Sequence, residues 1–386
     1  MAPIGTWSFP TLVRAGAGRI AEIGEACVEA GIVRPLFVTD RGVAALDIAE
    51  RALALLRAAG LEPEVFTHVD PNPTDANVAA GLLAMRENGH DGIVAFGGGS
   101  ALDAGKVIAF MRGQSLPWTA FEDRGSNWKA ADATGIAPVV AVPTTAGTGS
   151  EVGRAGVITD TDAGVKRIVF HPGMLPAQVI LDPELTLGLP PDLTAATGMD
   201  AFSHCLEAYC APSFHPAAEG VAVEGIRLVK EYLPRATFDG RDIEARTQML
   251  AAASLGATAF QKGLGAIHAL SHPIGALYGT HHGLTNAVIA PYVLDFNRDE
   301  IEAKIERLAG WLELEDGFAG FMDFLLRLRR DLGIPHTLDK IGVDEDRFDR
   351  MAAMAVEDPT AGGNPRLLTE ADARDLYERA LNGRLG

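Results

Sequence analysis

The pattern of apolar and polar residues divides the chain into two halves of different character. In the first half, short apolar runs rich in β-branched residues predict buried strands. These runs are Pro35–Asp40, Glu64–His68, Gly92–Phe96, Pro138–Val142 and Gln178–Asp182. Helical patterns lie between several of them, at Ala44–Ala59, Asp75–Asn88 and Ala101–Arg112. Strands alternating with helices in this way predict βαβ units and a mainly parallel sheet.

Three segments of this half depart from that rhythm. The runs Gly156–Asp160 and Arg167–Phe170 flank a short polar turn and predict a β-hairpin. The polar, glycine-containing stretch Phe121–Thr134 predicts a long loop near a site or an interface. The segment Gly16–Ala21 fits the dinucleotide fingerprint GxGxxA, but it follows a short run with Pro10 at the start of the chain. We therefore interpret it as a tight turn that leads into a helix.

The second half has almost no strand-like runs after Pro190 and Pro191. Helical patterns replace them at Leu193–Tyr209, Ala217–Leu233, Ile243–Gln261, Leu284–Phe296, Glu300–Leu312, Phe318–Asp331, Glu345–Ala355 and Glu370–Leu381. The sequence therefore predicts an α/β domain over residues 1–187 and an all-helical domain over residues 188–386.

Composition narrows the class of protein. The 386 residues are 47% hydrophobic and 22% charged, which is typical of a globular chain with a large core. Its three cysteines form no CxxC pair, which predicts no disulfide framework and fits a reducing cytoplasm. A net charge of −18 repels phosphate and argues against a nucleic-acid partner. We expect no signal peptide and no membrane span, because the chain has neither a basic-then-apolar start nor an uncharged apolar run of about 18 residues.

One aspartate and several histidines are spaced for a divalent metal. Asp200 and His204 are four residues apart in a predicted helix, so they share one face. His268 and His272 repeat this spacing, and His282 follows after a predicted turn. Iron and zinc bind imidazole nitrogen and carboxylate oxygen, so the spacing predicts a metal used for chemistry. A single helical histidine more often serves packing, but two such pairs are harder to explain that way. No HExxH motif indicates a metalloprotease.

Glycines and hydroxyl residues after strands are typical of a nucleotide site. The turn Gly97–Ser100 opens a helix, where backbone N–H groups can approach a phosphate. It could also be an ordinary turn in which Ser100 caps the helix and Asp103 completes a capping box. Asp40 ends another strand, where a carboxylate can accept from a ribose hydroxyl, or can simply cap the next turn. Val142–Val152 adds hydroxyls that suit a cofactor phosphate or amide.

Several linked motifs occur in order along the chain. They are PNPT (71–74), GGGSxxDxxK (97–106), PTTAGTGSEV (143–152), GMDAxxHxxExY (198–209), HxxxHPxGxxxxxxHG (268–283) and GNPR (363–366). In this combination the chain resembles the iron-containing, or group III, alcohol dehydrogenases over nearly its whole length. The resemblance implies a Rossmann-like dinucleotide-binding domain followed by an all-helical metal-binding domain, an architecture shared with dehydroquinate synthase.

The resemblance also implies roles for individual residues. The implied metal ligands are Asp200, His204, His268 and His282, with Fe²⁺ as the expected ion and Zn²⁺ as the alternative. His272 would be a nearby non-ligand histidine suited to proton relay, and His281 a bystander. Asp40 would favour NAD over NADP. The other implied cofactor-binding residues are Gly97, Gly98, Gly99, Ser100, Asp103, Thr144, Thr145, Thr148 and Lys166.

The implied activity is that of an NAD-linked alcohol dehydrogenase or aldehyde reductase. Hydride would pass between nicotinamide and a small primary or secondary alcohol or aldehyde bound to the metal. We also expect a cytoplasmic homodimer or larger homo-oligomer.

Two positions depart from the family pattern. Arg154 could anchor an anionic substrate or be a surface arginine, and Thr360 could line the substrate pocket. Arg154 thus leaves open a sibling reductase of the hydroxyacid, semialdehyde or maleylacetate type. A lyase of the dehydroquinate synthase type is disfavoured, because its metal set contains a glutamate in place of the Asp200–His204 pair.

Overall fold

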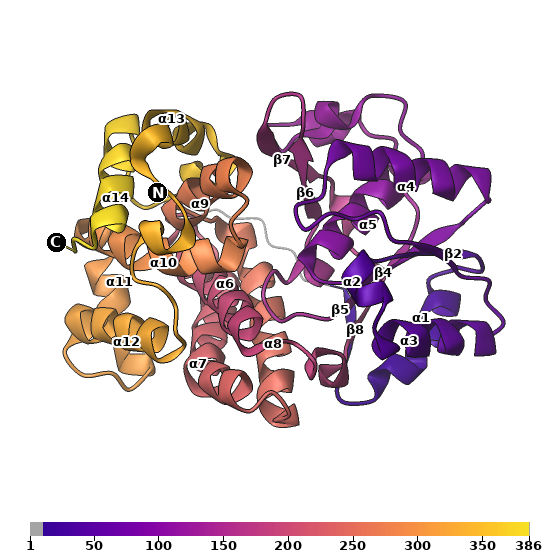
Figure 1. Ribbon diagram of the computed structural model, residues 1–386, viewed down its shortest axis with the longest axis horizontal. Coiled ribbons are helices and arrows are strands. Elements are labelled where there is room, and N and C mark those ends of the chain that lie inside the picture. The colour runs from indigo at the N-terminus through magenta and orange to yellow at the C-terminus, as the bar shows by residue number, and fades with distance from the viewer. Residues whose placement is uncertain (1–10, 386) are drawn as a thin grey trace. The chain divides into compact units, whose positions relative to one another are not determined.

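The chain folds into two compact units, which the computed structural model describes over residues 11–188 and 189–385 (Figure 1). The division between them lies after Gly188, and the sequence placed it after residue 187. The start of the chain, on which the expectation of no signal peptide depended, lies outside the described residues. Among residues 11–385, no helix is both long and apolar enough to cross a membrane.

A six-stranded sheet forms the centre of the first unit, in the order β1-β8-β5-β4-β2-β3. The strands are β1 (Leu12–Ala15), β2 (Pro35–Val38), β3 (Glu64–Phe66), β4 (Gly92–Gly97), β5 (Val139–Pro143) and β8 (Gln178–Leu181). Every pairing in this sheet is parallel, as predicted. The sequence did not predict β1, which pairs only with β8 at the edge of the sheet.

Helices cover both faces of this sheet. They are α1 (Ile23–Glu29), α2 (Arg41–Ala44), α3 (Asp47–Ala58), α4 (Asp75–Glu87) and α5 (Gly99–Met111). Val94 and Phe96 of β4 belong to a core that includes residues of α1 and α3. Ala95 points the other way, and a Cβ added to Gly105 of α5 would lie 2.9 Å from its Cβ. Figure 1 shows α1 and α3 on one side of the strands and α4 and α5 on the other.

Two smaller predictions in this unit are confirmed. Strands β6 (Ala155–Asp160) and β7 (Val165–Phe170) form an antiparallel hairpin. The glycines at the start of the chain form a tight turn that leads into α1, with Gly18 at a φ of +77°. The Asp182 carboxylate accepts from the N–H groups of Gly18 and Ile20, at 3.1 and 2.8 Å. The Gly18 and Ile20 donors of this turn are therefore satisfied by the chain itself, as expected for a tight turn.

The second unit is helical, as predicted, and no strand occurs among residues 189–385. Its long helices are α6 (Pro191–Cys210), α7 (Pro216–Phe238), α8 (Ile243–Ala259), α9 (Ala266–Tyr278), α10 (His282–Phe296), α11 (Arg298–Trp311), α12 (Gly317–Asp331), α13 (Phe348–Glu357) and α14 (Glu370–Asn382). Helix α6 is buried along most of its length, and α7, α8 and α10 pack against it.

Glycines allow two of these helices to approach α6 closely. A Cβ on Gly283 of α10 would lie 2.2 Å from the carbonyl oxygen of Ala196 and 2.9 Å from the Cβ of Asp200. A Cβ on Gly256 of α8 would lie 3.1 Å from the Cβ of His204. Close approach at both points brings α8 and α10 against the turn of α6 that carries Asp200 and His204.

Candidate active site

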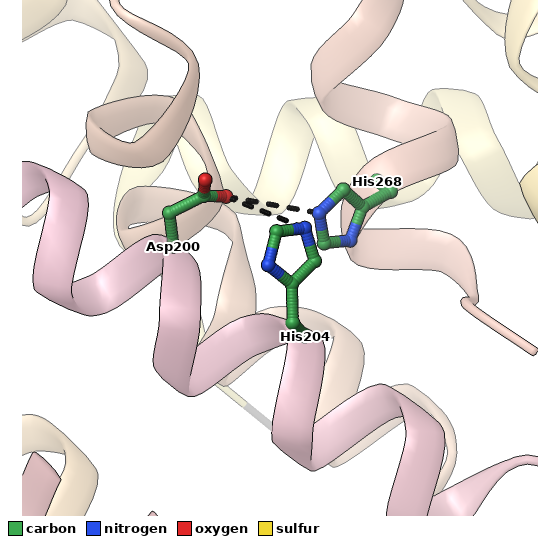
Figure 2. Close-up of side chains that lie close together, drawn as sticks. All are labelled: Asp200, His204 and His268. Carbon is green, nitrogen blue, oxygen red and sulfur yellow. Dashed lines mark ion pairs between the residues drawn. The ribbon is translucent and has the colours of Figure 1, made fainter. Parts of the chain in front are cut away.

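Three of the predicted metal ligands form a compact, buried group. Asp200 and His204 project from α6 and His268 from α9, and Figure 2 shows the three side chains turned toward one another. The Asp200 Oδ1 atom lies 3.9 Å from His204 Nε2 and 3.8 Å from His268 Nε2. All three offer a ligand atom within 4.8 Å of the others. The side chains are between 2 and 7% exposed, so no bulk water screens them.

His282 joins this group from a third helix. It is the first residue of α10, and its Nε2 atom lies 3.6 Å from Asp200 Oδ1. Its ring centroid is 5.2 Å from that of His268, and its side chain is 27% exposed. Separations of this size between ligand atoms suit a single ion bound at about 2.0–2.2 Å. The structure thus brings together all four residues predicted as metal ligands.

The negative charge of Asp200 and positive charge on the neighbouring histidine rings stabilise each other. Burial opposes the ionisation of Asp200, but His204, His282 and His268 outweigh it and hold the Asp200 pKa far below its usual value. Burial likewise opposes the charged form of His268, but Glu207 and Asp200 outweigh it and raise the His268 pKa to about 9. The carboxylates therefore stabilise positive charge at this point of the unit.

Asn286 lies among the same atoms, and the sequence analysis missed it. Its Nδ2 atom is 2.8 Å from Asp200 Oδ1 and 3.2 Å from both His268 Nε2 and His282 Nε2. Its own Oδ1 is buried and has no hydrogen-bond partner among the described residues. A buried convergence of acceptor atoms of this kind fits a cation. The missed signal was spacing, because Asn286 lies one turn after His282 on the same helix face.

Glu207 is a second residue that the sequence analysis missed, and it contacts His268 at Nδ1, the ring nitrogen not directed at Asp200. Its Oε2 atom lies 2.5 Å from His268 Nδ1, and its Oε1 accepts from the Ile267 N–H at 2.6 Å. Because an ionised carboxylate only accepts, Nδ1 carries a proton, and Nε2 is the nitrogen that can bind a metal once its own proton has left. Asn364 of the GNPR motif accepts from the Ala266 N–H at 3.1 Å, which fixes the start of α9.

His272 lies next to the cluster and has a different carboxylate partner. Its ring stacks on His282 with centroids 5.3 Å apart and an interplanar angle of 18°. Its Nδ1 atom lies 2.8 Å from Asp358 Oδ2. The N–H and the hydroxyl of Thr360 both donate to the other oxygen of Asp358, at 2.9 and 2.5 Å. The buried Thr360, predicted to line the substrate pocket, thus holds Asp358 in place.

Burial opposes the ionisation of Asp358, but the electrostatic interaction with His272 and the hydrogen bonds from His272 and Thr360 outweigh it. The pKa of Asp358 is therefore lowered. The carboxylate is ionised at neutral pH and can only accept from its two neighbours. His281, the expected bystander, caps the start of α10 through an interaction with the Leu284 N–H.

In the first unit, the glycine turn differs from the capping box considered for it. Helix α5 begins at Gly99 with Gly98 as its N-cap, so Ser100 lies inside the helix and does not cap it. The alternative prediction of Ser100 as the N-cap was wrong, because Gly98 already takes the extended N-cap conformation, at φ −75° and ψ −175°. Asp103 instead accepts from the Ser150 hydroxyl at 2.5 Å and the Val157 N–H at 3.0 Å. It thereby ties the helix to the hydroxyl-rich segment after β5.

The predicted threonines lie along this turn. The Thr144 N–H donates to the Gly97 carbonyl at 2.9 Å. A Cβ on Gly98 would lie 3.5 Å from the Thr145 methyl, and one on Gly99 only 2.4 Å from the Thr148 methyl. The structure therefore brings Gly97–Ser100 together with Thr144, Thr145 and Thr148, and Gly99 has no room for a side chain.

Asp40 adjoins the same turn. Its Oδ1 atom caps α2 by accepting from the N–H groups of Gly42 and Val43, at 2.8 and 3.0 Å. A Cβ on Gly97 would lie 3.7 Å from the other oxygen of Asp40. Capping and proximity to the turn thus coexist at this residue. Lys166, in β7, donates to Asn72 of the PNPT motif at 2.8 Å.

Arg154 packs in the hairpin region of the first unit. Its guanidinium lies 5.5 Å from the centroid of the Phe170 ring, a cation–π geometry. Burial raises the pKa of nearby Asp123, and the charge of Arg154 opposes that rise. These contacts give Arg154 a local role, and the alternative of an enzyme specialised for an anion anchored by Arg154 is not favoured.

An open parallel sheet with a glycine turn, joined to helices that bury one carboxylate among imidazoles, is typical of a metal-dependent, nucleotide-linked oxidoreductase. Comparison with known proteins makes the class specific. Residues 10–183 match the family model "Iron-containing alcohol dehydrogenase", and residues 194–381 match "Fe-containing alcohol dehydrogenase family, C-terminal". The chain belongs to the iron-containing alcohol dehydrogenase family.

Individual relatives cover nearly the whole chain. It is 41% identical to 4-hydroxybutyrate dehydrogenase of Cupriavidus necator, over 97% of this chain and 99% of that one. It is 35% identical to NAD-dependent methanol dehydrogenase of Bacillus methanolicus, over 95% and 97% of the two chains. A crystal structure of 1,3-propanediol oxidoreductase is 35% identical and superposes with a TM-score of 0.92, over 98% and 100% of the chains. The protein is therefore a metal-dependent alcohol dehydrogenase.

Proposed function

We propose that this alcohol dehydrogenase is NAD-linked and iron-dependent and that it interconverts a small alcohol with its aldehyde. The observation that carries the proposal is the buried convergence of Asp200, His204, His268 and His282 from three helices. Family membership supports iron as the ion. The donor set itself also accepts zinc, because imidazole nitrogen and carboxylate oxygen suit several divalent metals.

These four residues would hold the metal. Two further residues contact their side chains and help to orient them. Glu207 keeps the His268 lone pair on Nε2, and Asn286 lies within hydrogen-bonding distance of three of the four ligand atoms. When bound, a divalent metal supplies Lewis-acid polarisation of the alcohol or aldehyde oxygen. Burial of Asp200, His204 and His268 keeps bulk water from competing with the substrate oxygen.

The nucleotide would bind at the glycine turn of the first unit. Backbone N–H groups of Gly98–Ser100 at the start of α5 would face the pyrophosphate, since a helix N-terminus favours anions. Asp40, beside Gly97, would accept from the ribose hydroxyl and disfavour a 2′-phosphate. The methanol dehydrogenase relative is named as NAD-dependent, which supports this choice of cofactor. NAD supplies the hydride acceptor for alcohol oxidation.

The substrate is a small primary or secondary alcohol. The relatives are named for 4-hydroxybutyrate, methanol and 1,3-propanediol, which share a primary hydroxyl on a short chain. His272, beside the cluster, would take the proton that alcohol oxidation releases. The homo-oligomeric state and the cytoplasmic location stay predictions.

Substitution of His268 by alanine tests the metal assignment. We expect His268→Ala to lose both bound iron and turnover, because removing a ligand that Glu207 orients leaves the ion with three donors. Iron content by mass spectrometry and NADH formation with methanol, 1,3-propanediol and 4-hydroxybutyrate measure the two effects. His90, another buried histidine paired with a glutamate, provides the control, and His90→Ala should keep its metal. Full activity of His268→Ala after chelator treatment would overturn the assignment.

A further inference from the structure

We propose that Asp358 is the positioning residue of His272, holding the ring hydrogen on Nδ1 so that the Nε2 lone pair accepts the alcohol proton. The inference rests on the proposed function and adds a residue to it. Oxidation of an alcohol to an aldehyde breaks one C–H and one O–H bond. The hydride passes to NAD⁺ to give NADH, and the remaining proton passes to His272 Nε2 and then to solvent.

The geometry fixes the tautomer. His272 Nδ1 lies 2.8 Å from Asp358 Oδ2, with side chains 10% and 9% exposed. An ionised carboxylate has no proton to give, so the hydrogen of this bond belongs to Nδ1. A neutral imidazole carries one hydrogen, which leaves the lone pair on Nε2.

The Asp358 carboxylate is held in place by hydrogen bonds from Thr360, independently of the metal. Asp358 is the N-cap of the 3-10 helix Pro359–Gly363, and its Oδ1 accepts from both the N–H and the hydroxyl of Thr360. With Oδ1 engaged in this way, Oδ2 alone faces His272. On its other side, the His272 ring stacks on His282. The ring is thus fixed between a capped carboxylate and a neighbouring imidazole.

The Thr360 donors make an asparagine substitution informative. The backbone N–H of Thr360 cannot turn away, so the side chain of Asp358→Asn must keep an oxygen at the Oδ1 position. Its NH₂ group must then face His272 Nδ1. A donor at that place makes Nδ1 the acceptor and transfers the ring hydrogen to Nε2. The substitution would therefore preserve size and cap while inverting the tautomer.

The test combines a structural and a kinetic measurement on the iron-loaded enzyme and on its metal-free form. Nitrogen-15 NMR of histidine-labelled, metal-free protein reports which ring nitrogen of His272 is protonated, with His272→Gln identifying its signal. We expect an Nδ1–H ring in the parent protein and an Nε2–H ring in Asp358→Asn. For the iron-loaded enzyme we expect kcat to fall about 100-fold, as for loss of a general base. Iron content should not change, and KM should change by less than about threefold.

Asp344→Asn is the matched control. Asp344 also caps a 3-10 helix in this unit, and its carboxylate contacts Tyr278 instead of a histidine. Asp344→Asn should keep both the His272 tautomer and kcat, and Asp358→Glu should recover part of the lost kcat because it restores a carboxylate acceptor.

An Nε2–H ring in the parent protein would overturn the proposal without requiring any variant to fold. An Asp358→Asn enzyme that keeps its kcat would overturn it as well. Failure of the proposed function has a different signature, because the parent enzyme would then oxidise no alcohol while the NMR measurement still reports the tautomer.

Discussion

At the scale of single residues, the site depends on carboxylates that form hydrogen bonds with the histidine rings. Glu207 contacts His268, and Asp358 contacts His272, in each case through the Nδ1 atom of the ring. Each carboxylate also accepts from a backbone N–H, so its own position is fixed by the main chain. Each carboxylate therefore keeps a hydrogen-bond acceptor beside the Nδ1 atom of its histidine.

Substituting Glu207 tests this arrangement at the metal. We expect Glu207→Gln to weaken metal binding about 10- to 100-fold. The Ile267 N–H keeps the amide oxygen at the Oε1 position, so the NH₂ group faces His268 Nδ1 and cannot accept from it. Competition with a coloured chelator measures the dissociation constant. The control is Glu219→Gln, which removes a carboxylate that contacts Lys262 and Lys304. Equal metal affinity in Glu207→Gln and the parent would refute the role assigned to Glu207.

The sequence predicted those site residues whose spacing is local. Asp200 and His204 share a helix face because they are four residues apart, and the structure brings them together. Glu207 and Asp358 were missed because their histidine partners lie 61 and 86 residues away. Contacts of that length depend on how helices pack, which no local pattern records. Asn286 could have been found, since it follows His282 by one helical turn.

At the scale of secondary-structure elements, glycines set how closely helices approach. Gly283 follows His282 at the start of α10, where the helix touches the backbone of α6 at Ala196. A side chain there would collide with a carbonyl oxygen, which cannot move without disturbing α6. The separation of α6 and α10 therefore determines the distance between Asp200 and His282.

We expect Gly283→Ala to displace α10 and so to lower both metal content and thermal stability. The added methyl group would lie 2.2 Å from the Ala196 oxygen, far inside van der Waals contact. Core overpacking of this kind costs about 1–3 kcal/mol. The matched control is Gly310→Ala in α11, where a Cβ meets nothing within 4 Å. It should stabilise the helix by about 0.5–1 kcal/mol. Calorimetry and metal analysis of both variants check the contrast, and normal iron content in Gly283→Ala would contradict it.

The same scale shows where sequence patterns predict the fold and where they do not. Central strands such as β4 and β5 were predicted because burial on both faces produces continuous apolar runs. Strand β1 was missed because it has a polar Arg14 and an exposed Leu12 at the sheet edge. The cap of α5 was misjudged because Ser100 has the side chain of a typical N-cap, whereas the backbone of Gly98 determines the start of the helix.

At the scale of the whole molecule, all three cysteines are buried, one in the α/β unit and two in the helical unit. Burial raises the pKa of each of Cys27, Cys205 and Cys210 to about 12, from an ordinary value of 9.0. Because the reactive form of cysteine is the thiolate, these side chains are chemically inert in the folded protein.

This leads to a prediction with a defined direction in pH. The three thiols should resist a disulfide reagent at pH 8 and all react after denaturation. Their folded pKa values lie above the unfolded value, so their contribution to stability is complete below about pH 9. It is then lost as the pH rises toward 12. Thermal melts across this range measure the loss. Rapid labelling of native protein at pH 8, or Cys205→Ala leaving the alkaline slope unchanged, would contradict it.

The convergence of Asp200, His204, His268 and His282 also affects the lifetime of the protein. An ion held by α6, α9 and α10 acts as a cross-link between segments up to 82 residues apart (282 − 200). Its binding free energy adds to the free energy of unfolding, because the unfolded chain has no such site. Metal supply would then control the abundance of the enzyme as well as its turnover, since molecules without the ion would open more often and be degraded sooner.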